Sequence, residues 1–226
     1  MLTEFRRYPI TYTLILANSI IYIFMMLLSG NVIDIDIQTS VDMGALYAPY
    51  MILDNQWWRL ITSIFLHGGM THLLMNMFSL YLIGRGAENY FSKSAYLSLY
   101  LFAGFLGSFA SLFMHDDSVG LGASGAIFGL FGALAGFFLA YKEQIEEHSK
   151  AFMKQFAMII GINIIIGLAI PEVDVSAHVG GLVIGFIGGF ILSKKPRYIW
   201  IYSLIMLALM FISSRVLISQ YYSFLV

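Results

Sequence analysis

Apolar residues form long runs along most of the chain, and polar and charged residues gather between these runs. A helix needs about 20 apolar residues to cross the roughly 30 Å hydrocarbon layer of a bilayer. Several runs approach this length, and we expect each of them to form a membrane-spanning helix. The seven predicted spans are Ile10–Ser29, Thr71–Gly86, Ser94–Met114, Ser124–Tyr141, Ala151–Ile170, Ser176–Ser193 and Tyr198–Ser219.

Composition agrees with a chain whose main solvent is lipid. Hydrophobic residues make up 59% of the chain and charged residues only 11%, whereas a soluble domain carries about 25% charged residues. A net charge of −1 gives no indication of nucleic-acid binding, and the absence of cysteine excludes disulfides, thiolate metal sites and cysteine nucleophiles. The first apolar run is long and lacks a small-residue cleavage site, so we interpret it as a retained helix and not as a signal peptide.

The basic residues indicate how the helices are oriented. If the seven predicted spans alternate in direction, Arg59 and Arg215 lie on one side, and the other ten of the 12 Lys and Arg residues lie on the opposite side. Basic residues are enriched in cytoplasmic loops. We therefore expect a multi-pass protein of the cell membrane with a cytoplasmic N-terminus and an extracellular C-terminus.

The longest connection between predicted spans is Asn31–Met70, which is too long for a simple turn. Its second half is rich in Trp, Leu, Ile and Phe. We expect it to lie in the membrane interface, with Trp57 and Trp58 at the level of the lipid headgroups and Arg59 reaching phosphates. The alternative is a folded extracellular hairpin.

Four polar residues are predicted at a similar depth, near the starts of three helices that enter from the same side. His72 and Asn76 are spaced i, i+4 and share one face of the second span. Ser124 opens the fourth span, and His178 lies near the start of the sixth. Polar side chains are costly in a bilayer and usually face the interior of the bundle. We therefore expect these four side chains to face one another.

Glycines spaced by about four residues mark the fourth and sixth spans. They include Gly125 and Gly129 on the fourth span and Gly181, Gly185 and Gly189 on the sixth. Small residues in this rhythm let helix backbones approach closely. These two helices are thus the best pair to be in direct contact, which would bring Ser124 and His178 within hydrogen-bond reach.

A serine beside a histidine permits nucleophilic hydrolysis. His178 would accept the Ser124 proton and later protonate the leaving amine. The backbone N–H of Ser124 at a helix start, together with His72 and Asn76, would stabilise the oxyanion. No acidic residue lies in the spans near His178, so we predict a dyad without an orienting carboxylate. Water must reach such a site, so we also expect a wet cavity there.

Each of these residues also has an ordinary structural interpretation. Ser124 at a helix start can be a simple cap, and an intramembrane His or Asn can be an interhelical hydrogen-bonder. We give such roles to His67, which can brace the loop entry, to Asn163, which we expect to bond between helices, and to His148 in a charged loop. The segment 115–117 is predicted to be a solvated loop, because it supplies too few ligands for a metal. We expect no metal and no cofactor.

Several short motifs resemble those of the rhomboid family of intramembrane serine proteases, and the resemblance extends from Trp58 to Gly189. Gly122–Gly125 resembles the nucleophile motif, and Ala177–Gly181 together with Gly185 resembles the base motif. His72–Asn76 resembles the segment that carries the oxyanion pair. Trp58-Arg59 resembles the first-loop signature, and Gly84–Glu88 resembles a motif at the end of the second helix. Phe128 stands where some members carry a tyrosine that stacks on the catalytic histidine, and a phenyl ring can still stack there.

The resemblance implies an all-α bundle with a short cytoplasmic tail at 1–9, a six-helix core at 10–193, and an additional C-terminal helix and tail at 198–226. It implies an endopeptidase that cleaves single-span membrane proteins near the outer face. Small residues would precede the cut, and helix-destabilising residues would follow it. The fifth helix and the segment Pro171–Val175 would form a lateral gate and a cap.

Two other functions stay open at this point. A non-catalytic rhomboid-like binder of membrane helices would keep the packing glycines but usually lose the serine or the histidine, and this sequence has both. A small transporter or channel would use the intramembrane His and Asn, but the internal repeats and broken helices of many transporters are not visible. The expected partners are membrane-protein substrates and the lipid bilayer, not nucleic acid.

Overall fold

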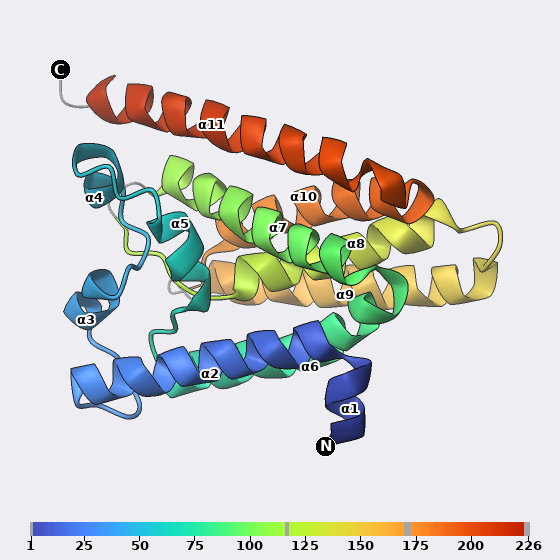
Figure 1. The fold of residues 1–226 in the computed structure, drawn as a ribbon, viewed down its shortest axis with the longest axis horizontal. Coiled ribbons are helices and arrows are strands. Elements are labelled where there is room, and N and C mark those ends of the chain that lie inside the picture. The colour runs from blue at the N-terminus through green and yellow to red at the C-terminus, as the bar shows by residue number, and fades with distance from the viewer. Residues whose placement is uncertain (1, 116–117, 170–172, 224–226) are drawn as a thin grey trace.

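The computed structural model describes residues 2–115, 118–169 and 173–223, and in these ranges the chain folds into a bundle of helices. Long helices correspond to all seven predicted spans, with ends that differ by a few residues (Figure 1). They are α2 (Pro9–Ser29), α6 (Met70–Tyr90), α7 (Lys93–Met114), α8 (Ser124–Ala140), α9 (Glu146–Ala169), α10 (Val175–Lys194) and α11 (Ile199–Ser223). A short α1 (Leu2–Arg7) precedes them.

Five stretches of the described chain are long and apolar enough to cross a membrane. They are Pro9–Ser29, Lys93–Met114, Lys150–Gly167, Val175–Lys194 and Pro196–Ser223. The helix α8 is apolar but shorter, and α6 carries Arg85 and Glu88 in its last turns. Length and composition thus support five spans, and the count of seven stays a prediction.

The connection between α2 and α6 is folded over the end of the bundle at which α6, α8 and α10 begin (Figure 1). We call this end the Ser124 end. The connection contains α3 (Ile37–Asp42), α4 (Ala48–Leu53), α5 (Arg59–Thr62) and a 3-10 turn at Ser63–Phe65. Short helices therefore take the place of the hairpin that was the alternative prediction.

Arg59 points into this connection and not toward lipid phosphates, so that part of the prediction is wrong. Its side chain is only 3% exposed. Its Nη1 donates hydrogen bonds to the carbonyl oxygens of Val41 (2.7 Å) and Ala45 (2.8 Å), and its guanidinium lies over the rings of Tyr50 and Trp58. The buried carbonyls of the turn need donors, and a guanidinium supplies several at once.

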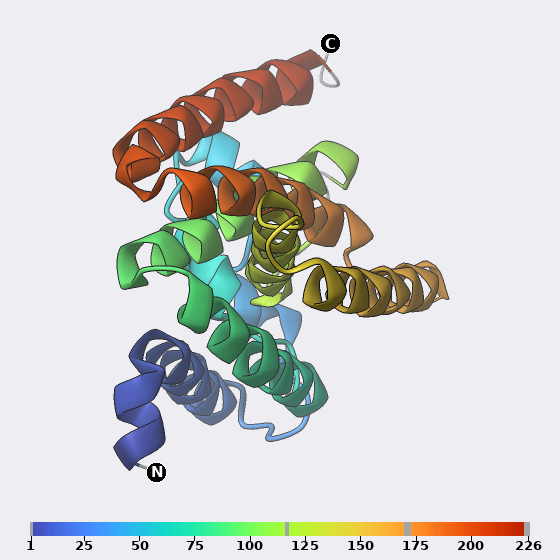
Figure 2. The same ribbon diagram turned by 90° about the vertical axis from the view of Figure 1, so that its right-hand side faces the viewer.

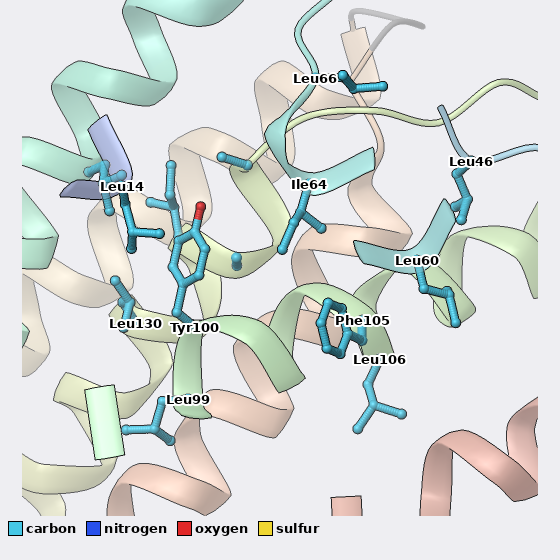
Figure 3. Packing of buried hydrophobic residues seen from close by; sticks show 14 of the residues in the cluster. Leu14, Leu46, Leu60, Ile64, Leu66, Leu99, Tyr100, Phe105, Leu106 and Leu130 are labelled. Atoms are coloured by element: carbon cyan, nitrogen blue, oxygen red, sulfur yellow. The ribbon is translucent and has the colours of Figure 1, made fainter. Parts of the chain in front are cut away.

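The folded connection is seated in the hydrophobic core of the bundle. Figure 3 shows Leu60 and Ile64 of the connection in the same cluster as Phe105 and Leu106 of α7 and Leu130 of α8. All are less than a tenth exposed. The connection is therefore fixed by burial of apolar side chains, which is favourable in proportion to the area removed from water.

Glu88 joins α6 to the start of α2. Its carboxylate accepts hydrogen bonds from the backbone N–H of Ile10 (2.8 Å) and from the N–H (3.0 Å) and hydroxyl (2.8 Å) of Thr11. The first N–H groups of a helix lack partners within the helix, and a negative charge is favourable there. Glu88 thus has a structural role at the opposite end of the bundle from Ser124.

The pair α8 and α10 forms the most extensive helix contact in the described structure, as predicted. A Cβ atom added at Gly181 would collide with the Gly125 carbonyl, and one at Gly185 would collide with the Gly129 carbonyl. By contrast, Figure 2 shows α9 at the side of the bundle, and only 6% of its apolar window is buried. Two of the neighbours of α8, α9 and α10, are thus held very differently.

Candidate active site

Ser124 is the first residue of α8, and its hydroxyl does not cap that helix. Ala123 occupies the capping position, and no side chain makes a capping hydrogen bond. A capping serine would instead accept a hydrogen bond from a backbone N–H two or three residues later. The half-buried side chain of Ser124 lines a cavity of about 330 Å³. The interpretation of Ser124 as a simple cap is therefore wrong.

The cavity at the Ser124 end has a lining that is about half polar among the described residues. Its other polar side chains are Ser63, His72, Ser108, Ser111, His115, Ser118 and Asp174. Ser108 and Ser111 belong to α7, which therefore turns hydroxyls toward the cavity and not toward lipid. Groups of this kind can hydrogen-bond ordered water. The lining is thus suited to the wet cavity that the sequence predicts.

His178 lies in the first turn of α10, and its ring packs against α8. The imidazole stacks on the Phe128 ring, with 4.2 Å between the ring centroids and 7° between the ring planes. Phe128 follows Ser124 by about one helical turn, so this contact places His178 beside the start of α8. No hydrogen bond of the described residues joins Ser124 to His178. The expected stacking is present, and the dyad itself stays a prediction.

His72 and Asn76 of α6 face the backbone just before Ser124. A Cβ atom built on Gly122 would lie 2.8 Å from His72 Nε2 and 3.8 Å from Asn76 Nδ2. His72 lines the cavity together with Ser124, whereas Asn76 is buried and its Nδ2 has no hydrogen-bond partner within the described ranges. The i, i+4 pair therefore brings two side-chain nitrogens to the segment that carries Ser124.

The segment before Ser124 is held by the connection between α2 and α6. Leu46 and Gly120 exchange backbone hydrogen bonds of 2.8 and 2.9 Å, and the Gly122 N–H donates to the Ser63 carbonyl at 2.9 Å. Gly122 has φ +127°, a conformation that L side chains rarely adopt. Because a side chain there would also meet His72, glycine is required at this position for two reasons.

His67 packs edge-on against His72, with 5.1 Å between the ring centroids and 69° between the planes. It is completely buried. Burial, with a smaller contribution from His72, lowers the pKa of His67 to about 3, so its ring is neutral at physiological pH. This position fits the predicted role of a brace at the end of the connection.

Of the other polar residues that the sequence singles out, His115 lines the cavity, and Asn163 lines a small hollow with His178 and Phe128. Asn163 was expected to bond between helices, but its Nδ2 donates to the Ile159 carbonyl of its own helix at 2.9 Å, so that prediction is wrong. Residues 116–117 of the predicted solvated loop, residues 171–172 of the predicted cap and the side chain of His148 lie outside the described residues.

A family model described as a Rhomboid domain matches residues 54–195, a range that contains Ser124, His178, His72 and Asn76. The chain belongs to the rhomboid family. The apolar helices and this assignment agree, and the protein is an all-helical, multi-pass membrane protein.

Curated rhomboid relatives extend the match in plants and bacteria. RHOMBOID-like protein 6, mitochondrial, of Arabidopsis thaliana is 40% identical over 162 residues, which cover 72% of this chain and 52% of that protein. The rhomboid protease GluP of Bacillus subtilis is 36% identical over 177 residues, covering 78% and 34%. The rhomboid-type protein YdcA of B. subtilis is 33% identical over 199 residues, covering 86% and 94%. The chain thus spans about half or less of the first two relatives and nearly all of YdcA.

Sequence reasoning misses two residues of this rhomboid site. Ser63 supplies the carbonyl that fixes Gly122, and no sequence signal marks it. Asp174 caps α10 and lines the cavity, about one helical turn before His178. Its spacing of three residues before Ala177 is that of an N-cap and its helix, and this signal could have found it.

Proposed function

We propose that this rhomboid-family protein is an intramembrane serine endopeptidase in which Ser124 is the nucleophile and His178 the base. The observation that carries the proposal is the Ser124–Phe128–His178 arrangement. An uncommitted hydroxyl opens α8 in a polar cavity, and one turn later the histidine of α10 lies flat on the same helix. The tight α8–α10 contact supports this, because it leaves little freedom to separate the two side chains.

The reaction would begin when His178 takes the Ser124 proton and Ser124 Oγ bonds to the scissile carbonyl carbon. The carbonyl oxygen then carries the negative charge. When the tetrahedral intermediate collapses, His178 returns the proton to the leaving amine, and the carbonyl stays bound to Ser124 as an ester. Water from the polar cavity attacks this ester, with His178 again as base, and releases the second product.

Donors for the oxyanion would come from α8 and α6. The N–H groups of the first turn of α8 have no partners within the helix, and the helix dipole is positive there. Asn76 Nδ2 is a buried donor without a partner among the described residues, which is costly unless a ligand or transition state uses it. His72 Nε2 lies on the same side. Removal of one such donor typically slows an acyl-transfer enzyme about 10²–10³-fold.

The substrates we propose are single-span membrane proteins that are cut near the outer face of the membrane. The cavity lies at the Ser124 end, which the distribution of basic residues assigns to the outside. The helix α9 would be the lateral gate, because little of its apolar window is buried. A substrate helix entering beside α9 would meet the α8 side of the cavity first.

A fluorophosphonate probe tests this proposal on the purified protein. Wild type should be labelled and Ser124→Ala should not. Ser118→Ala is the matched control, because Ser118 lines the same cavity and should be dispensable. Labelling that persists in Ser124→Ala would overturn the assignment of the nucleophile. A wild type that traps a membrane helix in a stable complex and never cuts it would favour the non-catalytic alternative.

A comparison of membrane proteomes from cells with wild type or Ser124→Ala would then identify substrates. A defined cleavage product present only with wild type would establish the activity in the cell. Solute flux through proteoliposomes that Ser124→Ala leaves intact would instead point to a transporter.

A further inference from the structure

Asp174 fixes the first turn of α10, the turn that carries His178. Its Oδ1 accepts a hydrogen bond from the Ala177 N–H at 2.9 Å, and its backbone carbonyl accepts one from the His178 N–H at 3.2 Å. The residue is therefore bonded both to the residue before the proposed base and to the base itself. A side chain that accepts in this capping position stabilises the start of the helix.

The same turn is pressed between two neighbouring backbones. A Cβ atom on Gly107 of α7 would lie 2.7 Å from the Ala177 carbonyl oxygen, and one on Gly125 of α8 would lie 3.4 Å from it. Ala177 therefore has little room to move, and the hydrogen bond from its N–H to Asp174 sets the direction in which the turn starts. The direction of this first helical turn sets the position of the His178 ring on Phe128.

The carboxylate of Asp174 also gives the cavity a negative charge that no Lys or Arg among the described lining residues offsets. The described residues that line the cavity include Asp174, His72 and His115 but no Lys or Arg. Asp174 precedes His178 by about one helical turn, and its backbone carbonyl accepts from the His178 N–H at 3.2 Å. When His178 takes the serine proton it becomes a cation, and a nearby opposite charge favours the charged form of such a group. A carboxylate one turn away would stabilise that imidazolium.

We propose that Asp174 is a positioning residue for His178, because it caps the turn that orients the imidazole and its uncompensated carboxylate stabilises the imidazolium formed during catalysis. The inference rests on the proposed protease function and adds a charged residue to the predicted dyad. The carboxylate acts from the side of the cavity, since it makes no hydrogen bond to the His178 ring among the described residues.

Two substitutions separate the cap from the charge. Asp174→Asn keeps a good N-cap and removes the charge, whereas Asp174→Ala removes both. The matched control is Asp36→Asn, because Asp36 caps α3 in the same way, by accepting from the Thr39 N–H at 2.8 Å, and does not line the cavity. The full-length variants are reconstituted in liposomes with a transmembrane peptide substrate, and kcat, KM and the unfolding temperature are measured for each.

We expect Asp174→Asn to lower kcat about tenfold, the scale of one favourable nearby charge, with KM and the unfolding temperature close to wild type. Asp174→Ala should lower kcat further and also lower the unfolding temperature. Asp36→Asn should leave kcat unchanged. A wild-type kcat in Asp174→Asn would overturn the inference. So would losses of kcat in Asp174→Asn and Asp174→Ala that are fully explained by a smaller fraction of folded protein. A wild type that neither cleaves the peptide nor reacts with a fluorophosphonate overturns the proposed function, and the inference with it.

Discussion

The helices α9 and α10 both contact α8, but they are held against it in different ways. The contact with α10 is backbone against backbone, with Gly181 and Gly185 facing the carbonyls of α8. The contact with α9 depends on aromatic rings near the start of α9. Phe152 stacks on Phe138 with 4.2 Å between the centroids, and Phe156 lies 4.8 Å from Phe131. One neighbour is thus held along its length, and the other mainly toward one end.

This difference follows from what each helix carries. The proposed base is on α10. Because α10 meets α8 through glycines, the two backbones are in direct contact, and α10 has little room to shift. On α9, a Cβ atom built at Gly161 would have no heavy atom within 4 Å, so that part of the helix surface is open. Beyond it, Ile160 and Asn163 face His178 and Phe128 across a small hollow. A movement of α9 would therefore open a path to His178 without disturbing the α8–α10 pair.

The largest expected effect comes from adding one methyl group to the tight contact. In Gly185→Ala the new Cβ would collide with the Gly129 carbonyl, and backbone cannot yield as a side chain can. Overpacking of this kind costs typically 1–3 kcal/mol or more. We expect a large drop in the unfolding temperature in detergent micelles and loss of fluorophosphonate labelling.

The same change on the loose helix is the control. Gly161→Ala places its methyl group in open space and removes a glycine from a helix interior, which favours the helix by up to about 1 kcal/mol. Its unfolding temperature should be unchanged or slightly higher. If both alanine variants lowered the unfolding temperature equally, the contrast between α9 and α10 would be wrong.

The contrast also explains which features were predictable from sequence. The predicted spans agree with the long helices to within a few residues because the length of an apolar run is a local property. The α8–α10 pairing was predictable because both helices carry the glycine rhythm. The loose packing of α9 was not predictable from residue patterns, because Ile, Phe and Met occur both on surfaces that face lipid and on surfaces that face a neighbouring helix.

Polar residues outside the spans were harder to place. Arg59 was expected to reach lipid phosphates, but its partners are the Val41 and Ala45 carbonyls, whose exposure depends on how a 40-residue connection folds. Asp174 was treated as part of a loop, although it caps α10. Asn163 bonds to the Ile159 carbonyl of its own helix, although His178 of α10 lines the same small hollow. The errors at Arg59 and Asn163 concern tertiary context that residue spacing does not contain, whereas the cap at Asp174 could have been found from its spacing to Ala177.

A smaller but still large loss of activity is expected from a substitution at Asn76 of α6. Asn76→Ala removes a buried donor that has no partner in the resting structure, so it should cost little stability. If Asn76 Nδ2 meets the oxyanion, kcat should fall about 10²–10³-fold. The measurement is kcat for a transmembrane peptide together with the unfolding temperature. Asn18→Ala is the control for the loss of a buried asparagine, because Asn18 belongs to α2 and its Nδ2 donates to the Leu14 carbonyl of its own helix. An unchanged kcat in Asn76→Ala would remove the residue from the proposed oxyanion site.

The smallest expected effect concerns the loose helix. Phe156→Ala removes a ring that holds α9 against Phe131, while the α8–α10 contact stays intact. If α9 gates entry of the substrate helix, the variant should cleave a transmembrane peptide a few-fold faster, because lid opening often limits such enzymes. Its fluorophosphonate labelling rate should change less, since a small probe needs less opening.

Phe24→Ala on α2 is the control, because Phe24 is 53% exposed and α2 is not a neighbour of α9. Equal acceleration of peptide cleavage and labelling would mean that Phe156 shapes the site itself, and slower cleavage without loss of stability would argue against α9 as the gate.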